Sequence, residues 1–223
     1  MESVSNVGVI DKGVAILQAL ALGPLDLAAL QAATGMPRAT AHRLAVALEE
    51  HHLVRRDAQG RFCLGFELIR LGRAAADEFP LAELATPVLM ELRDDTGESV
   101  QLYVREHDAR RCVVSLQSSH ALQWIVPVGA LLPLEVGSAG KVLAGAVLGR
   151  QGERDVDVRP WAESVEEREA GVASVSSAVV DRSGAIVAAV SISGPVERLT
   201  RTPGRRFGAQ VHSAAERISA HVR

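Results

Sequence analysis

Seven arginines lie between positions 38 and 73 of a 223-residue chain whose formal net charge is −3. Only four carboxylates share this stretch, so it carries a local positive surplus inside a mildly acidic protein. Guanidinium groups bind phosphates and the edges of guanine bases. The cluster therefore indicates a nucleic-acid partner for this part of the chain, although a GC-rich genome would also favour arginine.

The first arginines of the stretch belong to a predicted helix with two different faces. At about 100° per residue, Leu44 and Leu48 fall on one side, and the other side carries hydrogen-bond donors and small residues. Such a surface suits close approach to a DNA major groove. We predict groove contacts from Arg38, Ala39, Thr40, His42 and Arg43. The alternative is a solvated amphipathic helix.

A predicted hairpin after this helix carries three more arginines. Its strands cover residues 54–56 and 61–64, and residues 57–60 form the turn. Arginines on such a hairpin suit phosphate contacts, which fix the position of a protein on DNA without reading its sequence. We assign this role to Arg55, Arg56 and Arg61.

Serines in the second half of the chain indicate binding of a small polar ligand. Ser191 and Ser193 share one face of a predicted strand, because alternate side chains point the same way, and Ser174 lies on the partner strand. Hydroxyl groups that face a buried surface are costly unless they are hydrogen-bonded. A polar ligand would satisfy them, and so would backbone groups or water.

A second candidate ligand site is the start of a predicted helix at residues 139–148. Free N–H groups at Ser138, Ala139 and Gly140 would suit a carboxylate. A phosphate loop is excluded, because Glu135 stands where the motif needs its first glycine and Val142 replaces its Ser or Thr. The alternative is that these small residues only allow tight packing.

The sequence shows no spaced catalytic motif, and its seven histidines do not have metal-ligand spacing. Cys63 and Cys112 are too few for a disulfide framework. We therefore predict no catalytic residues, no metal and no cofactor. No run of about 18 apolar residues indicates a membrane span, and the first eight residues do not resemble a signal peptide. We expect a cytoplasmic protein without a membrane partner.

The elements that would position these residues fall into two parts. In the first, Asp11 and Asp26 are predicted to cap helices, residues 34–36 form a turn, and Pro37 begins the helix that continues to about residue 51. With the hairpin, this is a winged helix-turn-helix. Residues 66–79 form one further helix, and Pro80 marks its end.

The second part is predicted to combine a mainly antiparallel sheet with helices. Helices are expected at residues 81–95, 139–148 and 203–221, and strands near 100–104, 111–116, 124–128, 172–180 and 185–193. Residues 181–184 form a hairpin turn. The fold class is thus α+β.

Separated motifs of this chain resemble the IclR family of bacterial transcription regulators. They comprise the strings 11–17 and 35–44, Leu64-Gly65 and Leu71-Gly72, and the segments 171–174 and 189–195. The resemblance implies a winged helix-turn-helix domain with a linker helix at about residues 66–79, a domain boundary near residues 76 and 77, and a GAF-like α/β effector-binding and oligomerisation domain at 77–223. It also implies DNA operators bound by homodimers or homotetramers.

The resemblance assigns effector contacts as well. Backbone amides at Ser138 to Gly140 and the hydroxyls of Ser174, Ser191 and Ser193 would hold an effector carboxylate. Two departures stand out. First, the family has an acidic residue upstream of the glycine that matches Gly171, but this chain has Ser164 at that position, so Glu166 is our candidate for that role. Second, the segment between Lys141 and Gly171 is shorter than is usual in the family.

Three functions follow as hypotheses. The first is a sequence-specific DNA-binding transcriptional regulator whose operator binding is modulated by a small organic acid. The second is a DNA-binding regulator with a degenerate pocket, controlled by a protein partner or by its abundance, which the short segment favours. The third is an enzyme on a GAF-like scaffold.

Overall fold

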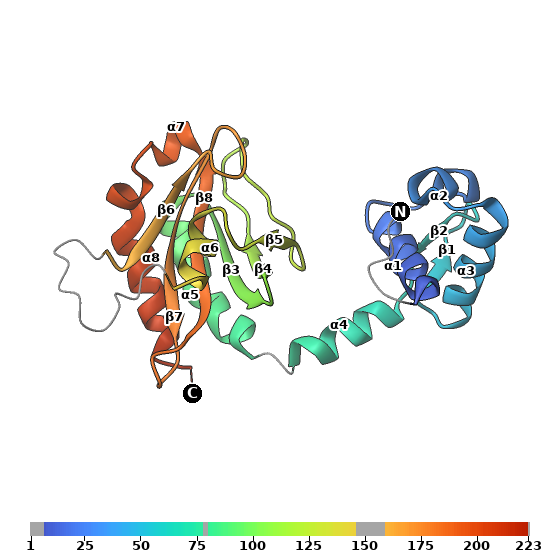
Figure 1. The fold of residues 1–223 in the computed structure, drawn as a ribbon, viewed down its shortest axis with the longest axis horizontal. Helices are drawn as coiled ribbons and strands as arrows, with labels where there is room; N and C mark the ends of the chain where they lie inside the picture. The colour runs from blue at the N-terminus through green and yellow to red at the C-terminus, as the bar shows by residue number, and fades with distance from the viewer. Residues whose placement is uncertain (1–6, 78–79, 146–158, 223) are drawn as a thin grey trace. The chain divides into compact units, whose positions relative to one another are not determined.

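The computed structural model describes residues 7–77, 80–145 and 159–222. The chain divides into an N-terminal unit, Met1–Phe79, and a C-terminal unit, Pro80–Arg223, and each is described by itself (Figure 1). In the part of the chain that the structure describes, no helix has both the length and the apolar character needed to cross a membrane.

The N-terminal unit contains three helices, a two-stranded antiparallel ribbon and a fourth helix. These are α1 (Gly8–Leu20), α2 (Leu27–Thr34), α3 (Arg38–Glu50), β1 (Val54–Arg56), β2 (Phe62–Leu64) and α4 (Glu67–Asp77). Its core gathers apolar side chains from α1, α2, α3 and the ribbon, including Ile16, Leu30, Ala41 and Phe62. This is the predicted winged helix-turn-helix.

Local sequence signals explain the turn between α2 and α3. The Asp26 carboxylate accepts a hydrogen bond from the backbone N–H of Ala29 at 2.8 Å, as its predicted capping role requires. Gly35 ends α2 with a φ of +66°, a conformation that favours glycine. Pro37 has extended backbone at the N-cap, so α3 begins one residue later than predicted. The predicted cap at Asp11 is wrong, because α1 already begins at Gly8.

The C-terminal unit is built on a six-stranded antiparallel sheet with the order β5-β4-β3-β8-β7-β6. The strands are β3 (Ser99–Glu106), β4 (Ala109–Leu116), β5 (Leu131–Pro133), β6 (Trp161–Val165), β7 (Val172–Val180) and β8 (Ile186–Pro195). The helices are α5 (Leu81–Thr96), α6 (Ser138–Leu143), α7 (Val196–Leu199) and α8 (Pro203–Ser219). The antiparallel sheet agrees with the prediction.

The two faces of this sheet differ in chemistry. Helices α5 and α8 pack on one face, against an apolar layer that includes Leu102, Val175 and Ile192. Alternate residues of the same strands point to the other face, where α6 and residues of the loop before β5 pack against Tyr103, Cys112 and Ala189. Ser174, Ser191 and Ser193 lie on this second face because they alternate with the apolar layer.

Among the described residues of the C-terminal unit, one predicted strand is wrong, one predicted helix ends early, and three elements, β5, β6 and α7, were missed. Residues 124–128 form no strand, since β5 takes the edge of β4 and Pro127 has no N–H to donate. Helix α6 ends at Leu143, before Gly145 with a φ of +90°, and residues 146–148 of the predicted helix lie outside the described residues. Strand β6 and helix α7 are too short and too polar for the patterns we used.

The edge strand β6 is anchored by an indole that lies against two glycines of α8. A Cβ atom on Gly208 would lie 2.3 Å from Cε2 of Trp161, and one on Gly204 would lie 2.5 Å from its Nε1. Real Cβ atoms do not approach so closely, so the contact requires glycine at both positions. The spacing of four residues places both glycines on one face of α8.

We predict that Gly208→Ala destabilises the C-terminal unit. In an open helix this change would stabilise by about 1 kcal/mol, but here the added methyl group must displace the Trp161 ring, and overpacking costs about 1–3 kcal/mol. Calorimetric unfolding should therefore show a lower melting temperature. Gly13→Ala is the control, because a Cβ there meets nothing within 4 Å in α1 and should stabilise. A Gly208→Ala protein at least as stable as the wild type would contradict the packing argument.

Candidate functional site

Helix α3 presents its predicted DNA-binding residues to solvent. Ala41 and Ala45 are buried against the core, while Arg38, Ala39, His42 and Arg43 are exposed and Thr40 is half-buried. Among the described residues, Arg38, His42 and Arg43 form no side-chain hydrogen bond or ion pair. The exposed side of α3 therefore offers unoccupied donors, and small residues between them permit close approach.

The hairpin arginines are exposed but more strongly engaged. Arg56 pairs with Glu49 of α3 at 3.2 Å, and its guanidinium lies 4.1 Å from the centre of the Phe62 ring. Arg61 pairs with Asp57 at 2.7 Å. Arg55 has no carboxylate partner among these residues and lies over Phe66. These pairs could not be predicted, because the numbers of arginines and carboxylates do not reveal which side chains meet.

A row of polar side chains crosses the second face of the C-terminal sheet. The Ser138 hydroxyl lies 2.7 Å from both Ser174 Oγ and Ser176 Oγ, and the Ser193 hydroxyl donates to Gln101 Oε1 at 2.9 Å. Ser174 stands opposite Ser193, and Ser176 stands opposite Ser191. We had missed Ser176 and Gln101, although the alternation with Ser174 and the strand register place them on this face.

A small pocket of about 40 Å³ opens beside this row. It is lined by most of the predicted effector residues, namely Ser138, Ala139, Ser174, Ser191 and Ser193. Ser164, the position where the resemblance expects an acidic residue, also lines it. The other lining residues were not expected from the sequence and are Tyr103, Arg110, Trp124, Gly137, Arg168, Glu169 and Val172.

Two predicted effector residues do not line the pocket. Glu166 accepts a hydrogen bond from the Gly171 N–H at 3.0 Å and pairs with Arg201 at 3.1 Å. Gly140 packs instead of binding, since a Cβ there would lie 2.2 Å from the Leu134 carbonyl oxygen. Ser138 does not cap α6, because Gly137 is the N-cap and the serine hydroxyl turns to β7. Glu169 is the carboxylate that the pocket contains.

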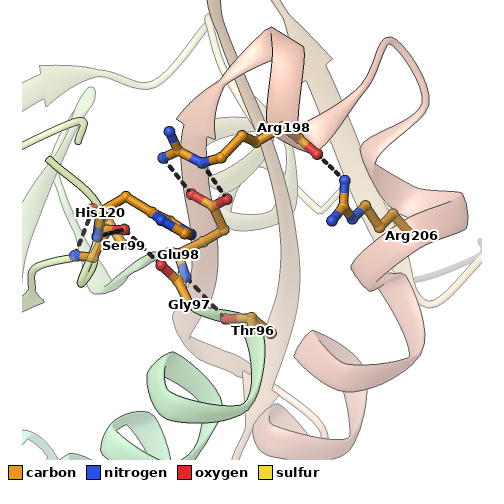
Figure 2. A network of polar contacts seen from close by, with 8 residues as sticks. Thr96, Gly97, Glu98, Ser99, His120, Arg198 and Arg206 are labelled. Atoms are coloured by element: carbon orange, nitrogen blue, oxygen red, sulfur yellow. Dashed lines mark hydrogen bonds and ion pairs between the residues drawn. The ribbon is translucent and has the colours of Figure 1, made fainter. Parts of the chain in front are cut away.

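The end of β8 that carries Ser193 lies beside an ion pair between the buried Glu98 and the partly exposed Arg198 (Figure 2). Glu98, at the start of β3, accepts from Nε of Arg198 at 2.7 Å and from its Nη2 at 2.9 Å. A Cβ on Gly194 would lie 2.6 Å from Oε2 of Glu98. The glycine that follows Ser193 therefore lets the carboxylate pack directly against β8. Arg206 extends the network by donating to the Arg198 carbonyl oxygen.

Lys141 of α6 ties the pocket wall to the turn before β7. Its ammonium group donates to the Glu163 carbonyl oxygen at 3.0 Å and to the Glu167 carboxylate. Glu167 also accepts from the Gly137 N–H at 3.1 Å. Burial raises the pKa of Glu167, but the hydrogen bonds from Lys141 and Gly137 outweigh burial and hold the pKa below its ordinary value.

We predict a pH-dependent loss of stability in Lys141→Met. A carboxyl whose pKa is lowered by folding stabilises the protein above its ordinary pKa of about 4.3, and this contribution disappears as the pH falls through the folded-state pKa. The difference in unfolding free energy between wild type and Lys141→Met should be largest near neutral pH and shrink below about pH 4. Urea titrations at several pH values measure it. A difference that stays constant with pH would refute the role of Glu167, and Glu167→Gln should make the lysine change pH-independent.

Comparisons with known proteins agree with this architecture. A model described as the IclR helix-turn-helix domain matches residues 9–58, and one described as the bacterial transcriptional regulator IclR C-terminal domain matches residues 73–151 and 154–220. The glycerol operon regulatory protein of Streptomyces coelicolor is 30% identical over 223 residues, covering 88% of each chain.

Two solved structures show the same fold. The IclR structure of Thermotoga maritima has a TM-score of 0.75 at 21% identity, covering 96% of this chain and 98% of that one. An IclR homologue of Microbacterium hydrocarbonoxydans in complex with 4-hydroxybenzoate has a TM-score of 0.75 at 19% identity, covering 95% and 98%. These matches confirm the predicted fold class. Because both family models match in this order and together cover most of the chain, the chain belongs to the IclR family of bacterial transcriptional regulators.

Proposed function

We propose that this regulator binds a specific DNA operator and that a small organic acid in the C-terminal unit modulates the binding. The observation that carries the DNA part is the outer side of α3. It combines three exposed donors that have no partner in the described structure, Arg38, His42 and Arg43, with the small side chain of Ala39. The opposite side is fixed in the core by Ala41 and Ala45. A cytoplasmic location follows from an operator partner.

The α3 residues and the hairpin arginines have different tasks in this proposal. Arg38, Ala39, Thr40, His42 and Arg43 enter the major groove, where arginine can bond both acceptors of a guanine. Arg55, Arg56 and Arg61 contact phosphates. The exposed ion pairs of Arg56 and Arg61 do not oppose this task, because such pairs contribute only about 0–1 kcal/mol and a phosphate can replace the carboxylate.

We predict that replacing both Arg38 and Arg43 by alanine removes sequence preference. On a site that the wild type selects from a random DNA pool, the binding free energy should weaken by about 2–6 kcal/mol, since each of the two base contacts is worth about 1–3 kcal/mol. Affinity for an unrelated duplex should fall much less. Fluorescence anisotropy on both duplexes measures the ratio. An unchanged ratio would show that α3 does not read the bases.

Arg55→Ala is the matched phosphate control. It should weaken binding to both duplexes about equally and lower the slope of log affinity against log salt concentration by about 1. Arg55 is suited to this test because it has no carboxylate partner among the described residues, so replacing it leaves no carboxylate unpaired.

The ligand part of the proposal rests on the buried polar row beside the pocket. Backbone amides of Ser138 and Ala139 and the hydroxyls of Ser174, Ser191 and Ser193 would bind the effector, and the homologue that holds 4-hydroxybenzoate supports an organic acid. Because Glu166 and Gly140 have other contacts, we leave them out of this set. The effector can shift operator binding by no more than its difference in affinity between the two states of the protein.

The small pocket also favours the second hypothesis. A volume of about 40 Å³ holds roughly three water molecules, so a larger acid requires the pocket to widen. If no small carboxylate raises the melting temperature, control by a protein partner or by abundance becomes the better explanation. Operator binding would stand in either case.

A homodimer or homotetramer is proposed as the binding form. Helix α4 has no buried residue, and the nearby apolar side chains of Phe66, Ile69 and Leu71 are 70%, 67% and 44% exposed. Exposed apolar side chains of this size, on and next to one helix, indicate a surface that a second copy covers.

We predict that Ile69→Lys weakens self-association by at least about tenfold, because it places a charge in an apolar contact. Sedimentation velocity over a concentration series measures the dissociation constant. Arg73→Ala, an exposed polar position of the same helix, should leave it unchanged. If Ile69→Lys and Arg73→Ala associate equally well, α4 does not contribute to the interface.

A further inference from the structure

We propose that Arg110 is the charged anchor of the pocket and makes it selective for monocarboxylates over neutral ligands. The inference rests on the proposed function, because it concerns the same pocket, and it names the residue that decides which chemical class of effector binds. The serines in the segments that resemble the family supply hydroxyl groups, which bind neutral and anionic ligands alike. A guanidinium group discriminates between them.

The buried charge of Arg110 has no counter-ion among the described residues. The residue is 3% exposed and comes from β4, on the same sheet face as the serine row. Its Nη1 donates to the carbonyl oxygens of Pro133 and Val136, and no carboxylate of the described residues pairs with it. The ring of Tyr103 lies 5.5 Å from the guanidinium. Carbonyl dipoles and a ring face compensate a buried cation only in part.

Donors in and next to the pocket lining have no hydrogen-bond partner in the part of the chain that the structure describes. They include Nε of Arg110, which is shielded from solvent, and Nε2 of Gln101, which lies next to the lining on β3. The Ser191 hydroxyl, which lines the pocket, has no hydrogen bond among the described residues. Buried donors are rarely left unpaired in folded proteins. A carboxylate, which only accepts hydrogen bonds and offers about four lone-pair sites, matches this set of donors.

The remaining charges of the pocket lining do not neutralise Arg110. Arg168 adds a second cation and lies over the Trp124 ring at 5.1 Å. Glu169 is the carboxylate of the lining, while the nearby Glu167 is occupied by Lys141 and the Gly137 N–H. Burial also lowers the pKa of Arg110, which is the direction expected for a cation without a counter-ion.

The adjacent Arg111 is a matched control on the same strand. Its side chain points to the opposite side of β4, where Nη2 bonds Glu106 at 2.6 Å and Nη1 bonds the Gly129 carbonyl oxygen at 2.7 Å. It does not line the pocket. Arg111→Gln therefore removes the same charge from the same strand without touching the proposed anchor.

The test measures binding to the full-length protein by calorimetry and by the shift in melting temperature. The probes are acid and amide pairs of matched shape: acetate and acetamide, lactate and lactamide, benzoate and benzamide. We expect at least one carboxylate to bind the wild type and Arg111→Gln equally, while its amide does not bind. Arg110→Gln should lose at least about tenfold in affinity, the effect of one charge-assisted hydrogen bond, and Arg110→Lys should lose less.

The possible outcomes distinguish failure of the Arg110 proposal from failure of the proposed effector control. If a carboxylate binds wild type and Arg110→Gln alike, the anchor is refuted while ligand control stands. If the amides bind as well as the acids, charge selectivity is refuted. If no carboxylate binds, both the anchor and effector control fail, and operator binding by α3 is judged on its own variants. Arg110→Gln loses the contacts to Pro133 and Val136 and could fail to fold for that reason. In that case, binding of the acid and amide pairs to the wild type still tests whether the pocket selects for a negative charge.

Discussion

The C-terminal unit depends on the need to satisfy polar groups on one buried sheet face. The opposite face is an ordinary apolar layer under α5 and α8, whereas this face carries Gln101, Ser176, Ser191, Ser193 and Arg110. An unsatisfied buried donor costs about 1–3 kcal/mol, so such a layer needs hydrogen bonds across strands. Ser138 supplies some of them from α6, whereas Nε of Arg110 and Nε2 of Gln101 have no partner among the described residues. In the proposed function, stability and ligand binding draw on the same set of groups.

Glycines place the pocket walls at the required distance. Gly140 allows α6 to approach the Leu134 carbonyl oxygen and the Arg110 guanidinium, and Gly194 allows Glu98 to pack against β8. In both cases a methyl group would occupy the position of a polar atom. In both glycine-containing motifs the glycine therefore allows close packing of the backbone, and in the proposed function the neighbouring serines contact the ligand.

Much of the N-terminal unit could be predicted from sequence because its signals are local. Asp26, Gly35 and Pro37 each act within a few residues of their position. The strand pair at 172–195 and its turn were predictable for the same reason. Arg110 was not, because its carbonyl partners lie 23 and 26 residues away and its burial arises only when α6 closes over the sheet. Glu166 is predicted from its closeness to position 164, where the resemblance expects an acidic residue, yet in the structure its carboxylate pairs with Arg201.

The structure also shows which of the arginines between positions 38 and 73 have their charge paired with a carboxylate. Three of its seven arginines, Arg56, Arg61 and Arg70, pair with Glu49, Asp57 and Glu67. Among the described residues, Arg38 and Arg43 of α3 have no carboxylate partner. A helix N-terminus already carries a partial positive charge, and Arg38 is the first residue of α3. If α3 reads DNA as we propose, the charge available for this task is therefore concentrated in the first half of the helix.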